Sequence, residues 1–348
     1  MKDRNCLILI TIIVIVGLLS GCGKEKYNER VKEEKIKATR DIFAMDTYMT
    51  LVAYGEKANE GLDEAVSEIQ RLDEMFSVGK EESEVSILNQ NGSEIVSDET
   101  KYLLEKALTI YRKTEGSFDI SVYPLMVEWG FTNQKYKLPT KDKIKELLQG
   151  VDASKIEHTK GKNFVSLPKQ MKIDFGGIAK GYTSQRIMEI FKKYNLTGGV
   201  VSLGGNVQTY GRKPDGTNYK IGIENPFGDE GYIGVLTVSE RAVITSGGYE
   251  RFFEKNGVKY HHILDPKTGY PAESGLTSVT IVNSDGTEAD GLSTALFVMG
   301  KEKAVNYWKK NGEKDGFDLI LVEKTGEITI TSGLEKSFIS DYPVKVIR

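Results

Sequence analysis

Cysteine is nearly absent from this chain of 348 residues. Its two cysteines, Cys6 and Cys22, both lie near the start, so the rest of the chain can form no disulfide and has no thiolate for catalysis or metal binding. Histidine, whose ordinary pKa lies close to neutrality, occurs three times. His158 lies in a charged segment with no other catalytic feature, whereas His261 and His262 stand together before an Asp-Pro turn.

An excess of positive charge is also missing. The formal net charge is −3 at pH 7, so the sequence shows no basic footprint for a nucleic acid. The two familiar glycine-rich nucleotide motifs, G-x-x-x-x-G-K-[ST] and G-x-G-x-x-G, do not fit the segment KIDFGGIAKGYTSQRI at residues 172–187. Its glycines, Gly176 and Gly177, could precede an anion-binding helix N-terminus or could serve only a tight turn. The residues alone leave both interpretations open.

A hydrophobic run long enough to cross a bilayer is missing too. The apolar residues 7–19 fall short of the roughly 20 that a spanning helix needs, and basic residues precede them, as in a secretory signal. The run ends in Leu19-Ser20-Gly21-Cys22, which resembles the lipobox of bacterial lipoproteins. We therefore expect a signal peptide over 1–21, lipid on Cys22, a charged tether over 22–40 and a lipid-anchored body at the extracytoplasmic face of the cell membrane. The alternative is an ordinary signal peptide with an incidental cysteine.

The remainder, 41–348, is predicted to be a single body of the α+β class with mostly antiparallel sheets and packed helices. Asp98 and Thr140 look like helix N-caps. The spacing of apolar residues predicts helices at 58–76, 98–114, 140–148, 178–194 and, as a pair, 288–310. Strands are predicted at 164–167, 171–175, 199–204, 219–223, 232–238, 242–245, 258–264, 276–283, 318–322 and 327–330. Helices do not separate these strands regularly, so a doubly wound Rossmann-type sheet does not fit.

Polar groups stand at two places where a plain core would not need them. Asp119 lies between an aromatic residue and apolar ones, so we expect its carboxylate to be part-buried and to need hydrogen-bond donors. Asp290 and Thr294 are four residues apart on a predicted helix and share one face. A carboxylate and a hydroxyl so placed offer oxygen ligands to a hard cation such as Mg²⁺. The alternative is that Asp290 only caps the helix and Thr294 only packs.

A series of segments, taken in order, resembles the ApbE family of flavin transferases, the FAD:protein FMN transferases. The resemblance covers nearly all of the chain from Phe43 to Ser340 and implies an ApbE-like, T-fold-related architecture. The matching segments are Met45-Asp46-Thr47, FSVGKEESEVSILN, GSFDISVYPL, IDFGGIAKGY, VSLGGN, TSGGYERFF, HILDPKTGYP and ADGLSTALFVMG.

The resemblance implies a chemistry and a set of site residues. Enzymes of this family cleave the pyrophosphate of FAD with Mg²⁺ and move the FMN half onto a threonine hydroxyl of a partner protein, with release of AMP. For this chain the implied acceptor is a membrane-associated redox protein. Carried over residue by residue, the implied metal ligands are Asp290 and Thr294 through side chains and Gly177 through its carbonyl. The implied FAD-site residues are Met45, Ser117, Phe118, Asp119, Asp174, Lys180, Leu264 and Ser293.

The base that activates the threonine hydroxyl is expected to be His262, with Asp174 as the competing candidate. A histidine that merely bonds a backbone carbonyl is the alternative role for His262. His261 is one residue away on a predicted strand, points to the opposite face and is expected to be non-catalytic. Two other functions stay open, an FAD pyrophosphatase that uses water and gives FMN and AMP, and a flavin-binding lipoprotein without chemistry.

The chain departs from the family pattern at two positions. Gly79 stands where the family often has an aromatic residue that packs on FAD, so stacking is expected to be lost or supplied by another ring, for example Tyr48 or Phe118. Asp46 replaces the glycine of the family's Met-Gly-Thr, and we interpret it as a tolerated variant.

Overall fold

The computed structural model describes residues 37–159, 161–228 and 231–348. The predicted signal peptide, the lipidated Cys22 and most of the predicted tether lie outside these residues and stay predictions. Residues 37–40, predicted as tether, instead form the start of the first strand, in which Ala38 is buried and pairs with Ala53. The described helices include none that is both long and apolar enough to cross a membrane.

A nine-stranded sheet forms the centre of the molecule, in the order β1-β2-β6-β7-β10-β13-β14-β15-β17. Its neighbouring strands are antiparallel except β15 and β17, which confirms the predicted α+β class with mostly antiparallel pairing. The strands are β1 Lys37–Ala44, β2 Thr47–Tyr54, β6 Gly198–Leu203, β7 Asn206–Gly211, β10 Ala242–Gly247, β13 Leu276–Asn283, β14 Asp318–Glu323, β15 Ile328–Thr331 and β17 Val344–Ile347.

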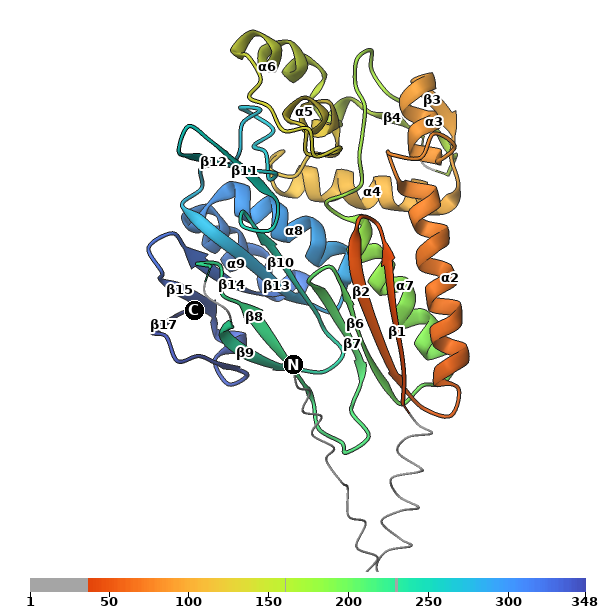
Figure 1. Cartoon of the computed structure of the whole chain (residues 1–348), viewed down its shortest axis with the longest axis vertical. Helices are drawn as coiled ribbons and strands as arrows, with labels where there is room; N and C mark the ends of the chain where they lie inside the picture. Colours follow the sequence, from red (N-terminus) through yellow and green to blue (C-terminus); the bar gives the residue numbers. More distant parts are fainter. Residues whose placement is uncertain (1–36, 160, 229–230) are drawn as a thin grey trace, which may run out of the picture.

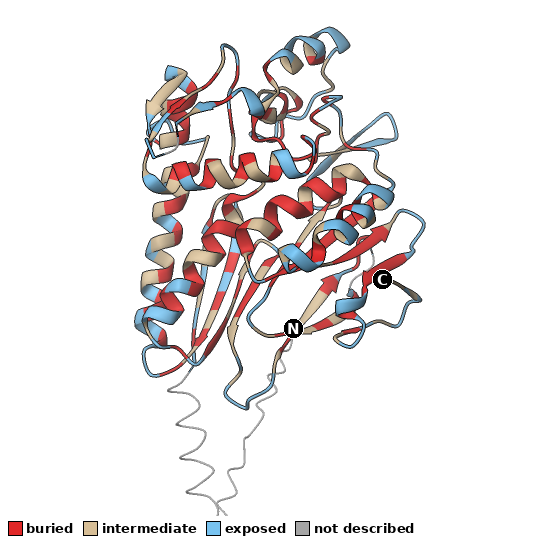
Figure 2. Ribbon diagram, turned by 180° about the vertical axis from the view of Figure 1, so that it is seen from behind, coloured by how far each residue is buried: buried red, intermediate tan, exposed pale blue. Residues whose placement is uncertain are grey.

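Helices cover one face of this sheet (Figure 1). Helices α2 and α7 pack on β1, β2, β6 and β7, whereas α8 and α9 pack on β10, β13 and β14. The described helices are α2 Ala58–Phe76, α3 Glu84–Asn91, α4 Asp98–Lys113, α5 Tyr123–Trp129, α6 Lys141–Leu147, α7 Ala179–Lys193, α8 Gly286–Met299 and α9 Lys301–Asp315. Helix α8 is buried along most of its length (Figure 2), because α4, α7 and the sheet surround it.

A smaller sheet, β16-β9-β8, packs against the opposite face of the large sheet. Both faces of β13 are therefore buried. Ile281 faces the helices, and the next residue, Val282, contacts the core beneath the small sheet. Its strands are β8 Tyr219–Glu224, β9 Tyr232–Val238 and β16 Phe338–Ile339. The remaining strands are β3 Ser93–Ile95, β4 Glu157–His158 and β5 Phe164–Ser166 in one sheet, and β11 Phe252–Lys255 and β12 Val258–His261 in a hairpin.

Two predictions about local structure are wrong. Residues 171–175 form no strand, because the backbone of Ile173 bonds to the side chain of Asn89 instead of to a neighbouring strand. Helix α4 is capped by the Ser97 hydroxyl, which accepts from the N–H of Thr100 at 3.2 Å, and Asp98 is its first residue. The Thr140 cap of α6 is confirmed. The sequence did not predict helices α3 and α5 or strands β1, β2, β3, β4, β7, β11, β16 and β17.

Candidate active site

Two tight hairpin turns lie side by side at one end of the large sheet. Met45 and Asp46 join β1 to β2 with φ values of 49° and 58°, and the two residues after Leu203 join β6 to β7 with φ of 60° and 89°. Two-residue turns with both φ positive match the twist of antiparallel strands. Aspartate tolerates this conformation, which explains why Asp46 can replace glycine there. A Cβ on Gly204 would lie 2.2 Å from Thr47 Oγ1, so glycine is needed for the turns to touch.

The Asp290 carboxylate is buried between α7, α8 and β7, with 5% of the residue exposed. It accepts hydrogen bonds from the N–H of Gly181 at 2.8 Å and from the Asn206 amide at 3.0 Å. The α8 N-cap is Asp285, whose side chain accepts from Glu288 N–H, so the capping role considered for Asp290 is wrong. Burial raises the pKa of the Asp290 carboxyl, opposed by the charge of Lys180.

The first turns of α7 and α8 meet almost backbone to backbone beside Asp290. A Cβ on Gly181 would lie 2.2 Å from the carbonyl oxygen of Gly286, and a Cβ on Gly286 would lie 2.8 Å from the carbonyl oxygen of Gly181. Both contacts are shorter than any real Cβ contact, so only glycine allows this approach. Because the two helices approach so closely, the Asp290 carboxylate of α8 lies within hydrogen-bond distance of the Gly181 N–H at the start of α7.

Further oxygen atoms gather around the same turn of α8. Ser246 Oγ at the end of β10 lies 3.2 Å from Thr294 Oγ1 and 2.7 Å from Ser293 Oγ. Ser293 also donates to the carbonyl oxygen of Asp290 at 2.8 Å. A Cβ on Gly177 would lie 3.9 Å from Thr294 Oγ1, so the glycine loop passes directly over this face of α8.

These donors fit Mg²⁺ by their chemistry. Asp290, Thr294 and the Gly177 carbonyl offer only oxygen, one of them a buried carboxylate that gains from a neighbouring cation. Within the described part of the chain no group of three or more His, Cys, Asp or Glu side chains could hold a metal. A site with a single carboxylate suits Mg²⁺, which usually keeps water and substrate phosphate oxygens as its other ligands.

Asp174 lies in the loop that precedes the two glycines. Its carboxylate accepts from Gly176 N–H at 2.9 Å, and its own N–H donates to the Ile120 carbonyl at 2.9 Å. Burial raises the pKa of the Asp174 carboxyl, against the opposing charge of Arg251. Lys180 follows in the first turn of α7, where its charge acts on both Asp290 and His262.

His262 follows β12 and is held by a single carbonyl. Its backbone N–H donates to the Arg251 oxygen at 3.0 Å, and its Nδ1 lies 3.2 Å from the same oxygen. A carbonyl only accepts, so Nδ1 carries the proton and Nε2 keeps its lone pair. Burial lowers the pKa of His262 to about 3, with a further contribution from the Arg251 charge. The imidazole is therefore neutral at pH 7, and the carbonyl bond orients it without occupying the basic nitrogen.

His261 faces another part of the molecule. Its Nε2 lies 3.2 Å from the Ala272 carbonyl, and its ring packs edge-on against Phe297 of α8 at 5.5 Å between centroids. Burial lowers the pKa of His261 to about 4. His262 instead packs against Phe131 at 6.4 Å. The two histidines thus contact opposite surroundings, as the predicted strand alternation requires.

Several of the predicted FAD-site residues are buried within the protein. The Asp119 carboxylate accepts from Ser121 N–H and Oγ at 2.8 and 2.6 Å and from Ala153 N–H at 3.2 Å, so protein donors satisfy both its oxygens. Phe118 packs against Gly177, next to the buried Ser117. Leu264 lies in an apolar cluster with Trp129 and its neighbours. These residues can shape the walls of the site, while their contact with FAD stays a prediction.

The two rings expected to replace the missing aromatic differ in access. Phe118 is buried, whereas Tyr48 is 76% exposed and packs edge-on against Phe43. A Cβ on Gly79 would meet only Ser77 Oγ, at 3.6 Å, so the position has room for a side chain. Met45 is tied to the same region, because Asp73 accepts from both Met45 N–H and the Lys80 ammonium, at 3.2 and 2.8 Å.

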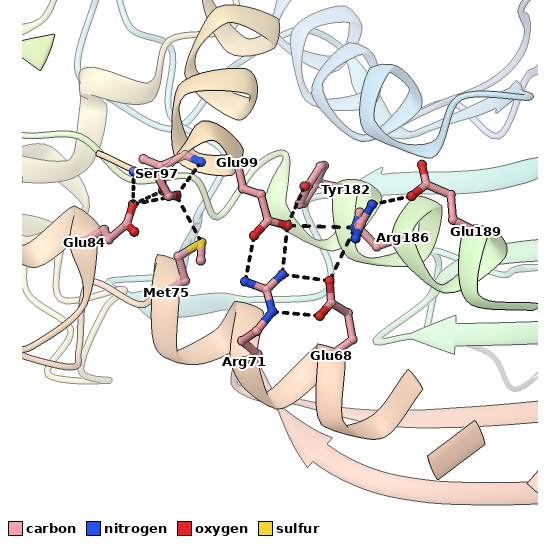
Figure 3. Close-up of polar contacts among 10 residues, drawn as sticks. Glu68, Arg71, Met75, Glu84, Ser97, Glu99, Tyr182, Arg186 and Glu189 are labelled. Carbon is pink, nitrogen blue, oxygen red and sulfur yellow. Dashed lines mark hydrogen bonds and ion pairs between the residues drawn. The ribbon is translucent and has the colours of Figure 1, made fainter. Parts of the chain in front are cut away.

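A charged network joins helix α7 to helices α2 and α4 (Figure 3). Glu99 of α4 accepts from Arg71 of α2 at 2.8 Å and from the Tyr182 hydroxyl at 3.0 Å. Glu68 bonds both Arg71 and Arg186, so three helices share one cluster. Hydrogen bonds from Arg71 lower the pKa of Glu68, which keeps the cluster charged. The network holds the helix that carries Lys180 and Gly181 in a fixed position.

A sequence model of the ApbE family matches residues 45–320. The chain belongs to the ApbE family. The FAD:protein FMN transferase of Haemophilus influenzae is 31% identical, with 87% of this chain and 90% of that protein covered. The FAD:protein FMN transferase of Treponema pallidum is also 31% identical, with 92% and 93% covered.

Solved ApbE structures share the fold. The ApbE protein from Thermotoga maritima superposes with a TM-score of 0.81 at 34% identity, covering 86% of this chain and 99% of that one. The flavin transferase ApbE from Vibrio cholerae superposes with a TM-score of 0.78 at 24% identity, which shows the fold alone. The predicted ApbE-like architecture is confirmed.

Sequence reasoning missed four residues of this ApbE site. Asn206 and Ser246 contact the predicted metal ligands, and Arg251 holds His262. Glu250 lines a hollow beside Arg251, and partial loss of hydration there raises the pKa of its carboxyl to about 7, against the charge of Lys180. The segments VSLGGN and TSGGYERFF that contain them were recognised, but only the folded chain shows which of their side chains reach the site.

Proposed function

We propose that this chain transfers the FMN half of FAD to a threonine hydroxyl of a partner protein and releases AMP, in a Mg²⁺-dependent reaction. The observation that carries the proposal is the neutral His262, oriented through Nδ1 by the Arg251 carbonyl, with the charge of Lys180 acting on both His262 and the buried Asp290. The curated relatives bear the name FAD:protein FMN transferase, which agrees with this assignment.

The bond changes assign a task to each group. The threonine oxygen forms a bond to the FMN-side phosphorus, and the bond from that phosphorus to the bridging oxygen breaks. The bridging oxygen leaves with AMP, and His262 Nε2 takes the hydroxyl proton. Asp174 is the competing acceptor of that proton. Lys180 contributes positive charge beside the phosphates, where transfer depends mainly on positioning and charge neutralisation.

Asp290, Thr294 and the Gly177 carbonyl would hold Mg²⁺ next to the pyrophosphate. When bound, the ion would polarise the phosphorus and stabilise the leaving phosphate. This assignment also explains why the glycine loop lacks the known nucleotide-binding motifs. A loop that offers a carbonyl oxygen to a cation does not need the backbone N–H groups with which a P-loop binds phosphate.

The place of the reaction is part of the proposal. The lipobox-like Leu19-Ser20-Gly21-Cys22 supports a lipid anchor on Cys22 and an acceptor exposed at the extracytoplasmic face of the membrane. Replacing Cys22 with Ala should release the chain from membranes and remove the acyl mass from its N-terminus. Full membrane partitioning of Cys22→Ala without any acyl mass in the wild type would contradict the anchor.

Turnover of FAD against Mg²⁺ concentration tests the metal assignment. Asp290→Asn removes the charge and keeps the size, so AMP release should fall by at least about 10³. Thr294→Val should cost less, because water can replace a neutral ligand. Raised Mg²⁺ should partly restore both variants, and urea unfolding serves as the control for lost stability. Wild-type turnover in Asp290→Asn, with unchanged Mg²⁺ dependence, would exclude the assignment.

The acceptor reaction has its own readout. Denaturing gels of mixtures with FAD, Mg²⁺ and candidate acceptor proteins should show flavin fluorescence on the acceptor band. FMN and AMP without any labelled band would indicate water as the acceptor, and FAD binding without AMP would indicate a binding protein.

A further inference from the structure

A hollow of about 440 Å³ is lined in part by Phe131 and Arg251, two residues that contact His262. Three separate parts of the chain line it: the tip of the β1–β2 hairpin, the loop after α5, and the segment that leads from β10 into the first residue of β11. The lining residues are Phe43, Asp46, Phe131, Thr132, Asn133, Gln134, Tyr136, Glu250, Arg251 and Phe252.

The hollow shares its wall with the proposed base. Phe131 lines the hollow and packs against the His262 ring at 6.4 Å. Arg251 lines it as well, donates from its guanidinium to the Phe131 carbonyl, and accepts from His262 through its own carbonyl. The hollow and the imidazole that would receive the acceptor's proton therefore share Phe131 and Arg251 as neighbours.

The rim of the hollow has the composition of a protein-binding surface. Phe43 is 66% exposed, and Tyr136 and Phe252 are also exposed. Exposed aromatic rings beside an arginine match the residues that dominate protein interfaces. The apolar surface also extends outward past the hollow to Tyr48, which packs against Phe43. A flavin ring would fill the hollow and leave these outer rings in water, whereas a protein segment would cover both.

We propose that this surface, from Phe43 and Tyr48 across the hollow to Tyr136 and Phe252, binds the segment of the acceptor protein that carries the target threonine. The proposal rests on the proposed transferase function and adds where the acceptor docks. The segment lies extended between the hairpin tip and the loop after α5, with its threonine directed at His262. Aromatic contacts on both sides of the threonine supply its affinity.

Cysteine labelling tests which molecule fills the hollow. The two native cysteines lie before residue 23, so a full chain with Cys6→Ala and Cys22→Ala can carry one new thiol, at Tyr136→Cys. Saturating FAD with Mg²⁺ should change the rate at which maleimide labels this thiol by no more than about twofold relative to the unliganded protein. A pool of threonine-centred peptides should slow labelling at least about fivefold. Phe164→Cys, at an exposed position on β5 outside the surface, should respond to neither.

Transfer kinetics give the second readout. Phe43→Ala should raise the KM for the peptide pool about tenfold and leave the Kd for FAD unchanged. Phe164→Ala removes a similarly exposed ring on β5 and should match the wild type in both.

The outcomes separate the proposals. Protection of Tyr136→Cys by FAD alone would place the flavin in the hollow and overturn the docking proposal. Unchanged labelling with peptides would overturn it as well. If peptides protect the thiol but no flavin is transferred from bound FAD, the docking surface stands and the transferase function fails.

Discussion

His262, the proposed base, is oriented by one backbone carbonyl. The Arg251 oxygen fixes the proton on Nδ1, and burial lowers the pKa to about 3. His262→Ala should retain FAD binding and slow transfer by about 10²–10⁴. Because the folded imidazole stays neutral down to acidic pH, wild-type transfer at subsaturating FAD should not fall near pH 6.5, where an ordinary histidine becomes protonated.

His261→Ala is the matched control for that experiment. Its ring contacts Phe297 and the Ala272 carbonyl, so transfer should stay within a few-fold of the wild type. A larger loss in His261→Ala than in His262→Ala would mean that the assignment of the two histidines is reversed. Asp174→Asn, measured alongside, tests the competing base.

Gly79 leaves open space where the family often has an aromatic residue. Its backbone φ is not in the left-handed region, and a Cβ there would meet only Ser77 Oγ. Gly79→Tyr should therefore tighten FAD binding by about 3–10-fold, the range expected for one aromatic stacking contact. Gly79→Ala adds the Cβ without the ring and should leave the Kd for FAD unchanged. Equal affinities in both variants would show that no ring from this position reaches FAD.

For individual residues, the sequence could predict contacts within one helix but could not predict contacts between distant segments. Asp290 and Thr294 could be paired from their i, i+4 spacing, because one helix sets that geometry. Ser246 reaches Thr294 only because β10 ends beside α8, and Asn206 reaches Asp290 only because β7 begins there. Contacts between segments that are distant in the sequence leave no pattern in the local sequence from which they could be predicted.

Among the elements, the extended segment at 171–175 depends on one side chain. The Asn89 amide donates to the Ile173 carbonyl at 2.8 Å and accepts from its N–H at 2.7 Å, as a strand neighbour would. Its alternating apolar residues predicted a strand, but alternation reports which side chains are buried and says nothing about the backbone partner. Asp174 is the next residue, so the two bonds from Asn89 also fix the position of its backbone.

Asn89→Leu removes both bonds at once. It leaves a buried N–H and carbonyl unpaired, so the free energy of unfolding should fall by at least about 2 kcal/mol. Transfer should also fall at temperatures where the variant is still folded, because Asp174 loses its support. Asn91→Ala, an exposed asparagine on the same helix whose amide bonds Glu94, is the control and should change stability by less than about 0.5 kcal/mol. Equal stability of both variants would contradict the role given to Asn89.

For the molecule as a whole, a half-buried neutral histidine, His261, makes stability depend on pH. The pKa of His261 is about 4 in the fold and about 6.5 in an unfolded chain, so between these values the unfolded state binds more protons. Its contribution to stability is present above pH 6.5 and is lost as pH falls toward 4, at up to about 1.4 kcal/mol per pH unit.

Comparison with His261→Gln isolates this contribution, because the buried carboxyls with raised pKa values titrate in both proteins. Urea unfolding at pH 7 and pH 5 should show the stability advantage of the wild type shrinking at the lower pH. A constant difference between the two proteins would contradict a neutral, buried His261.

The general architecture was predictable from the sequence, but its strand order was not. Helix and strand spacing indicated an α+β chain, and most helices lie where predicted. The pairing of β2 with β6 was hidden, because residues 55–197 separate strands that are neighbours in the sheet. Only packing of the whole chain selects that pairing.

The same wide separation would link the proposed flavin binding to folding. The proposed site draws Met45 from the first hairpin, Lys180 from the middle of the chain and Asp290 from α8, and the folded large sheet brings these segments together. A partly folded chain would therefore bind FAD poorly, so the ligand would select the finished structure. At a hundred times its Kd, a ligand of this kind adds about 2.7 kcal/mol to the free energy of unfolding. For a protein proposed to work outside the cytoplasm, the FAD concentration there would then also determine what fraction of the protein stays folded.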